Sequence, residues 1–229
     1  MTGYEPPAQY PYPYAGAPLK SDTSRWAVAA FCAALLYAVC EVTALLASVP
    51  LAREVQVSGT LDTVSPMVLL LNGGASLLGL VAVVTAWVLT CVWLMKARDN
   101  AFLLSPGIRQ RRGTAWLWLG WVVPFANFVV PFHVVSDVLR ASEQRSRGNT
   151  SGTALVGWWW ACWLAILIGG RIHSRMLDGV GSAEGSSADA VRNVGAVLVL
   201  LTVAGIVLWG LLVRRVVDSQ AGAEVPAAR

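Results

Sequence analysis

Apolar residues occur along this chain in five long blocks that are separated by short polar segments. A block of about 18 or more mostly apolar residues is long enough to cross the hydrocarbon core of a bilayer as a helix. Buried strands and core helices are shorter, so the pattern predicts a multi-pass membrane protein. The blocks cover residues 26–49, 67–95, 115–135, 153–170 and 193–213.

The block at 115–135 differs from the other four because Pro124 and Pro131 interrupt it. Each proline removes a backbone donor and clashes with the preceding turn, so a straight lipid-exposed helix is not expected there. Asn127 lies between the prolines, and its amide could satisfy the freed carbonyls and hold a re-entrant turn against the block at 153–170. Whether Asn127 is a structural staple or the lining of a pore or pocket stays open.

The predicted fold class is therefore an all-α integral membrane bundle of four transmembrane helices plus one proline-broken re-entrant or interfacial helical segment. Composition agrees, because 56% of the residues are hydrophobic and only 13% are charged. Soluble domains carry about 25% charged residues, so a soluble globular protein is excluded.

Lysine and arginine positions decide between four and five spans. If residues 115–135 re-enter the membrane, 13 of these residues lie on one side and 4 on the other, whereas a fifth span gives 10 and 7. Positive residues concentrate in cytoplasmic loops, so we expect four spans, with both termini cytoplasmic and a location in the plasma membrane. We also expect tryptophans near the block ends to sit at the cytoplasmic interface, namely Trp26, Trp93, Trp158, Trp159, Trp160 and Trp209.

Glu41 is an ionisable residue inside the first block, and it shares one helical face with small residues. Such residues line helix contacts in membranes, so Glu41 should face other helices rather than lipid. An intramembrane carboxylate is a candidate proton or cation site, but a neutral Glu41 that is hydrogen-bonded within the bundle is favoured. Its charge state stays open. The small-residue rows are Ala27, Ala30, Ala34, Ala44 and Ser48 in the first block, Ala75, Gly79, Ala82 and Ala86 in the second, and Gly157, Ala161, Ala165 and Gly169 in the fourth.

The polar ends of the chain set the domain boundaries. Residues 1–25 are rich in proline and tyrosine and predict a disordered cytoplasmic tail, because they cannot bury a core. The membrane helical domain is expected over 26–215, followed by a flexible C-terminal tail over 216–229. The loops 50–66 and 171–192 are expected to be plain connectors.

No pattern of catalytic, cofactor or metal-binding residues is found. The four cysteines lie singly inside apolar blocks, where they resemble buried hydrophobic residues rather than ligands. His133 and Asp137 are four residues apart and could contribute to a metal or proton site, but a local hydrogen bond, or a pair between Asp137 and Arg140, is favoured. The basic residues cluster between apolar blocks, which indicates anionic lipid headgroups rather than nucleic acid.

Three motifs follow one another along the chain. They are Trp93, Lys96, Arg98 and Asn100, then Trp121, Pro124, Asn127, Pro131 and Arg140, and finally Trp159, Trp160 and Trp163. In this order they resemble the domain of unknown function 4328 family, an uncharacterised actinobacterial membrane family, over about residues 85–218. Leu139 stands where a tryptophan is common in that family, and Asp99 where a basic residue is. The resemblance implies a multi-pass bacterial membrane protein and supplies no activity.

The expected role is non-enzymatic, through contacts with helices, lipid headgroups or a partner, which could be another membrane protein or a second copy of the chain. The alternative is a small transporter or channel subunit that uses Glu41 and Asn127, because a permeation path requires polar residues inside membrane blocks.

Overall fold

The computed structural model describes residues 22–105, 108, 110–147, 152–182 and 185–221, without the side chains of 144–147. Residues 1–21 and 222–229, which hold most of the two expected tails, lie outside this description. The long helices are α1 (Ser24–Ser58), α2 (Pro66–Leu104), α5 (Gly152–Asp178) and α6 (Ala188–Gln220). All four are long and apolar enough to cross a membrane.

The block at 115–135 forms short pieces instead of one helix. It contains α3 (Trp116–Leu119) and η1 (Ala126–Phe128), and it leads into α4 (Val130–Arg147). Pro124 lies in the turn between α3 and η1, whereas Pro131 occupies the first turn of α4, where proline is tolerated. The two prolines therefore have different roles, one breaking a helix and the other starting one.

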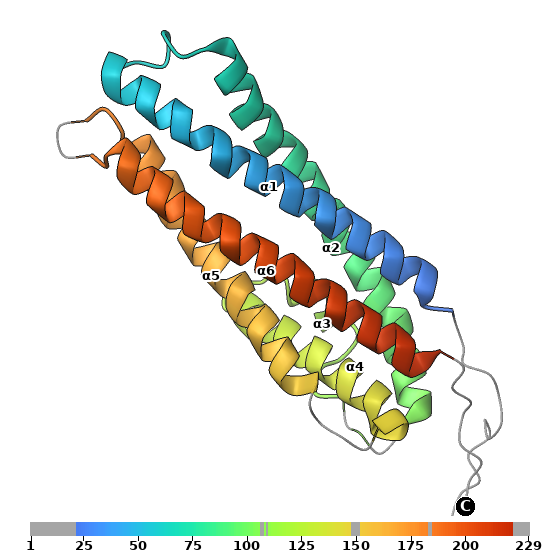
Figure 1. Ribbon diagram of the computed structural model, residues 1–229. Coiled ribbons are helices and arrows are strands. Elements are labelled where there is room, and N and C mark those ends of the chain that lie inside the picture. Colours follow the sequence, from blue (N-terminus) through green and yellow to red (C-terminus); the bar gives the residue numbers. More distant parts are fainter. Residues whose placement is uncertain (1–21, 106–107, 109, 148–151, 183–184, 222–229) are drawn as a thin grey trace, which may run out of the picture.

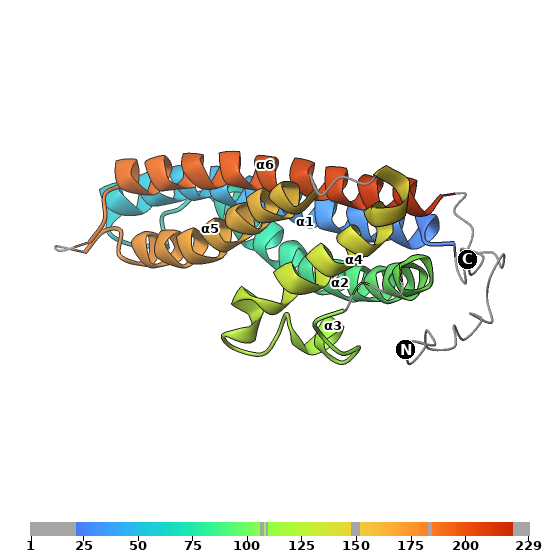
Figure 2. The ribbon, with the colours of Figure 1, turned by 90° about the horizontal axis from the view of Figure 1, so that it is seen from below.

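The long helices form two layers. Figure 2 shows α1 and α6 along one side, with α2 and α5 below them and the segment that carries α3 outermost. Helix α1 packs against α2 and α6, and α6 packs against α5, but α2 and α5 hardly touch each other. The bundle is therefore an open arc in the order α2, α1, α6, α5.

The two ends of the bundle differ (Figure 1). At one end α1 begins, α2 ends, α5 begins and α6 ends, and α4 packs there against α2, α5 and α6. We call this the α4 end. The opposite end, with the turns at 59–65 and 179–187, is the hairpin end. Gly59 and Gly181 adopt positive φ values of 76° and 89° in these turns, a conformation that glycine tolerates without strain.

Small residues allow α1 and α2 to approach closely. Gly79, Ala82 and Ala86 are buried, and a Cβ placed on Gly79 would lie 3.4 Å from the Cβ of Cys40. In the row of small residues on α5, Gly169 packs tightly against Leu198 of α6, whereas Ala161 is exposed. The predicted small-residue contact is thus made along α2 but only at one end of the α5 row.

The segment between α2 and α4 enters the bundle and returns to the α4 end. The Cys91 thiol donates a hydrogen bond to the Leu117 carbonyl at 3.0 Å. Cys91 lies 13 residues before the last residue of α2, which is about 20 Å at the rise of an α-helix. Trp121 contacts Trp163, 11 residues after the start of α5. Since α4 ends at the α4 end, where Ser142 contacts Gln220, the segment does not cross the bundle, and the predicted fold class is confirmed.

Two expected boundaries differ from the structure. Helix α6 continues to Gln220, so residues 216–220 of the expected C-terminal tail are helical, and Val216 and Gln220 are buried because α6 packs on α4 and α2. The loops expected to be plain connectors are also ordered in part. Helix α1 continues through Pro50 to Ser58, and the Gln56 side-chain oxygen accepts a hydrogen bond from the Ala188 amide at 2.7 Å.

Candidate functional site

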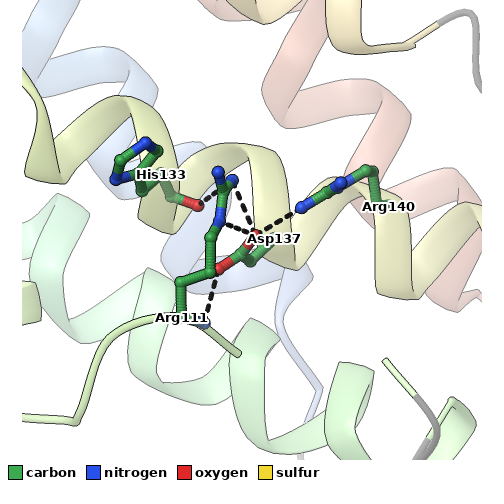
Figure 3. Close-up of polar contacts among 4 residues, drawn as sticks. All are labelled: Arg111, His133, Asp137 and Arg140. Carbon is green, nitrogen blue, oxygen red and sulfur yellow. Dashed lines mark hydrogen bonds and ion pairs between the residues drawn. The ribbon is translucent and has the colours of Figure 1, made fainter. Parts of the chain in front are cut away.

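The candidate site lies at the α4 end and is built around one buried carboxylate, Asp137, which is 1% exposed. Its side chain accepts hydrogen bonds from the Arg111 Nε and the Arg111 amide, both at 2.8 Å, and from Arg140 at 2.7 Å (Figure 3). Arg111 also donates to the His133 carbonyl at 3.4 Å. Asp137 therefore fixes the loop before α3 onto α4, and the predicted pair with Arg140 is confirmed.

Two further arginines lie beside this group. Arg98 of α2 donates to the Arg112 carbonyl, and the Arg112 charge acts on His133. Within the described part of the chain, neither Arg98 nor Arg112 makes an ion pair. We define Arg98, Arg111, Arg112 and Arg140 as the arginine cluster.

Several donors of the arginine cluster are buried and have no acceptor among the residues that the structure describes. They are Nη1 of Arg98, Nε of Arg112 and Nε of Arg140, and the Gln110 side-chain nitrogen is a fourth unpaired donor in the same loop. Most buried polar atoms in proteins have a partner, and exceptions point to an ion or water at the site or to a functional role. Among the described residues, the Asp137 carboxylate forms ion pairs with two of the four arginines and the other two form none, so the cluster has a local excess of positive charge.

The imidazole of His133 titrates in this positive environment. Burial and the charges of Arg111, Arg112 and Arg140 lower its pKa below the usual 6.5, and Asp137 opposes this only in part. His133 is therefore neutral at pH 7 and adds no charge there. Among the described residues, no three histidine, cysteine, aspartate or glutamate side chains are placed to hold a metal ion.

A polar junction beside the arginine cluster joins four helices through Gln220. The Gln220 amide nitrogen donates to the Ala97 carbonyl at 2.8 Å and to the Ser142 hydroxyl at 2.9 Å. Its oxygen accepts from Asn100 at 3.3 Å and from Thr23 at 3.4 Å. The motif residue Asn100 thus has a defined role, which is to tie α2 to the last turn of α6.

A second ion pair closes the α4 end next to Gln220. The Arg215 guanidinium of α6 donates to the carboxylate of Glu143, which is 3% exposed. A Cβ at Gly152 would lie 2.6 Å from the Glu143 carboxylate and 2.7 Å from the Leu139 side chain, so a larger residue where α5 begins would have to displace these side chains. Leu139, the position where the family often has tryptophan, is fully buried here.

Tryptophans from three elements form one continuous stack rather than an interfacial belt. Trp159 stacks on Trp209 at 4.9 Å between ring centroids, Trp160 stacks on Trp163 at 4.6 Å, and Trp93 meets Trp209 edge-on at 5.7 Å. Trp93, Trp159, Trp160 and Trp209 are each less than 8% exposed, so they pack against other helices rather than against lipid headgroups.

The remaining two tryptophans of that prediction are exposed. Trp158 is 69% exposed and Trp26 is 38% exposed. The motif residue Lys96 lies over the Trp26 ring, with its Nζ 5.5 Å from the centroid, which is a cation–π contact between α2 and the start of α1.

Asn127 does not hold the re-entrant turn as expected. Its side-chain oxygen is buried and accepts no hydrogen bond in the described structure. The Trp160 indole of α5 instead donates to the Phe128 carbonyl at 3.1 Å, and the ring of Trp121 packs edge-on against Trp163. A tryptophan of α5 supplies the donor because the backbone of the turn at Phe128 lies against that helix.

Glu41 is half-buried in the middle of α1. Within the described residues it makes no ion pair, and neither its carboxylate nor the Asn127 amide contacts the other. The two residues proposed for a permeation path are therefore not brought together.

Three residues that build the α4 end, Arg111, Glu143 and Gln220, were not expected to have the partners that they have. Their partners lie between 26 and 197 residues away in the chain. The sequence offered a weak signal for Glu143 and Gln220. Both are polar side chains on helices that pack in the bundle, and a buried polar side chain needs a hydrogen-bond partner.

The sequence of the chain matches one known protein family. A family model described as Domain of unknown function (DUF4328) matches residues 63–219. The chain belongs to this family. No curated protein and no solved structure matches the chain significantly.

The matched region of this DUF4328 protein contains α2 to α6 almost completely and begins after α1. It therefore includes the whole arginine cluster, the Glu143–Arg215 pair and the tryptophan stack. Gly120, in the central motif, is required by packing, since a Cβ there would lie 2.5 Å from Val130. The DUF4328 motifs thus mark tertiary contacts at the α4 end.

Proposed function

We propose that this protein is a non-enzymatic plasma-membrane protein of bacteria that holds the phosphate group of an anionic lipid at the arginine cluster. The four long apolar helices cross the bilayer in this proposal, and the α4 end faces the cytoplasm. Either a second copy of the chain or another membrane protein can then bind through the same face.

The observation that carries the proposal is the charge balance around Asp137. Asp137 pairs with two of the four arginines of the cluster, and the other two, Arg98 and Arg112, make no ion pair in the described part of the chain. The Arg111 and Arg140 side chains are 38% and 39% exposed. Guanidinium groups bind phosphate oxygens with matched geometry, and they are the preferred residues for that ligand. Exposed arginines at the end of a membrane helix bundle lie where lipid phosphates are concentrated.

The ion pairs at the α4 end favour binding over catalysis. Asp137 is held by two arginines and Glu143 by Arg215, so neither carboxylate is available to accept a proton from a substrate. His133 is the remaining titratable group beside them, and its ring lies away from the Arg111–Asp137 contact (Figure 3). Guanidinium groups that Asp137 holds in place are suited to binding an anion.

The experiment compares lipid retention by variants purified in nanodiscs of phosphatidylcholine and phosphatidylglycerol. Arg112→Gln removes a cluster charge that makes no ion pair in the described structure. Each basic residue near an anionic surface contributes about 1 kcal/mol, so phosphatidylglycerol enrichment should fall by up to about fivefold at low salt. Arg98→Gln should act in the same direction.

Arg192→Gln is the matched control, because it removes an equal charge at the hairpin end, where Arg192 pairs with Asp189 at 2.9 Å. Its lipid enrichment should equal that of the wild type. Equal losses in the control and the cluster variants, or no loss in either cluster variant, would overturn the proposal.

A further inference from the structure

A cavity of about 330 Å³ lies in the middle of the bundle, away from the arginine cluster. Its walls come from α1, α2, α5, α6 and the turn after α3. Pockets that bind small ligands have volumes of about 300–1,000 Å³, so the cavity is large enough for a ligand. Neither Glu41 nor Asn127 lines it.

The lining is apolar and largely aromatic. Tryptophan side chains from four elements contribute to it, including Trp87 of α2, Trp121 of the re-entrant turn, Trp163 of α5 and Trp209 of α6. Tyr37, Thr90 and Thr202 are the other lining side chains with polar atoms. Most of the lining surface is apolar, so the cavity favours an apolar occupant.

The cavity opens on the flank of the bundle rather than at an end. Its lining includes Val83 and Val84 in the middle of α2, which are 38% and 49% exposed, and Val122, which is 61% exposed. The opening exists because α2 and α5 hardly touch, and the re-entrant turn fills the space between them only from the α4 end up to Trp121. Anything that enters through the flank comes from the medium around the middle of the helices.

We infer that this cavity holds one acyl chain of a bilayer lipid, which enters sideways between α2 and α5. The inference rests on the membrane position proposed above but not on the arginine cluster. At mid-height the surrounding medium is hydrocarbon, and an acyl chain is the apolar group present there at the highest concentration. The tryptophan faces offer flat surfaces against which a narrow methylene chain packs closely.

The test uses the full chain in nanodiscs of phosphatidylcholine that carries a photoactivatable diazirine in the middle of one acyl chain. Trp159 and Trp209 line the cavity and are only 6% and 5% exposed. Label on these two residues, measured by mass spectrometry of peptides, therefore reports a chain inside the bundle. Leu200, which is 71% exposed on α6, reports ordinary contact with lipid.

Gly205→Leu fills the cavity from α6. A Cβ at Gly205 would meet Ile166 at 3.6 Å and Cys162 at 3.7 Å, which are ordinary contacts, so the backbone need not move. We expect at least a fivefold loss of label on Trp159 and Trp209, with Leu200 unchanged. Val203→Phe, which adds bulk to the exposed face of the same helix, should leave all three signals as in the wild type.

Ala34→Leu fills the cavity from α1 and replaces Gly205→Leu if that variant fails to fold. Label on Trp159 and Trp209 no higher than on Leu94, which is buried elsewhere, would overturn the inference, as would label that persists in a folded filled variant. Crosslinks between two copies of the chain at Val83 or Val122 would also overturn it in favour of a dimer. Phosphatidylcholine carries no net charge, so this outcome is independent of the lipid enrichment at the arginine cluster.

Discussion

Asp137 is the residue on which the geometry of the α4 end depends. It is almost fully buried and accepts hydrogen bonds from the side chain and the backbone of Arg111 and from the side chain of Arg140. A buried carboxylate is stable only when such partners compensate for its lost hydration. A buried carboxylate such as Asp137 favours one local structure, because an arrangement that separates it from its arginines leaves a buried charge unpaired.

Asp137→Ala should destabilise the protein by about 3 kcal/mol, the low end of the range for breaking a buried pair, since both arginine heads are partly exposed. Asp189→Ala is the control, because that carboxylate is 72% exposed and its pair with Arg192 should contribute less than about 1 kcal/mol. Thermal unfolding in detergent measures both. Equal effects of the two substitutions would show that Asp137 has no special role.

His133 should make stability depend on pH in a defined direction. Its pKa is lowered below 6.5 by burial and by Arg111, Arg112 and Arg140, with Asp137 opposing. The unfolded chain therefore takes up a proton first, and the folded state loses stability as the pH falls through 6.5 and below. His133→Gln should reduce the difference between the unfolding temperatures at pH 7.5 and pH 5.5. An unchanged difference would contradict the lowered pKa.

At the scale of elements, the re-entrant segment is held by side chains of the helices that it contacts. The Trp160 indole reaches the Phe128 carbonyl, and the Cys91 thiol reaches the Leu117 carbonyl. Phe125, at the tip, adopts a φ of 63° and is 83% exposed, which is a strained conformation for a residue with a side chain. The turn therefore depends on its neighbours for its shape.

Trp160→Phe should loosen this segment without unfolding the bundle. The substitution keeps an aromatic ring against Trp163 but removes the indole donor, which is a loss of about 1 kcal/mol. Hydrogen exchange of residues 121–129 should become faster, whereas exchange in α6 should stay the same. Trp158→Phe, at a 69% exposed position, is the control and should change neither segment.

The elements could be predicted from the sequence because block length and proline positions are local properties. The four long helices and the return of the third block follow from them. Side-chain partners are not local: the sequence suggested Arg140 for Asp137 but gave no indication of Arg111, which is 26 residues away. Asn127 was expected to hold the turn because it is the nearest polar side chain in the sequence. Nothing local shows that the Trp160 indole of α5 donates to the Phe128 carbonyl instead.

At the scale of the whole molecule, both flanks of the re-entrant segment belong to one end of the bundle. A chain without Cys32, Cys40, Cys91 and Cys162 allows single cysteines to be placed on each side of it. Thr114→Cys and Gln144→Cys should both resist an impermeant thiol reagent in intact cells and react after the membrane is opened. Ser58→Cys and Ser182→Cys, at exposed hairpin-end positions, should react in intact cells. Labelling of Gln144→Cys alone among the α4-end positions would indicate a fifth span.

The Gln220 junction has a consequence for the order in which the protein is made. Thr23 and Gln220 are 197 residues apart, so at 5–20 residues per second the ribosome reaches the second partner roughly 10–40 s after the first. During that interval Asn100, Ser142 and the Ala97 carbonyl lack the amide that completes them in the finished protein. A chain that stops before its last helical turn thus lacks the side chain that links α2, α4 and the start of α1 to α6.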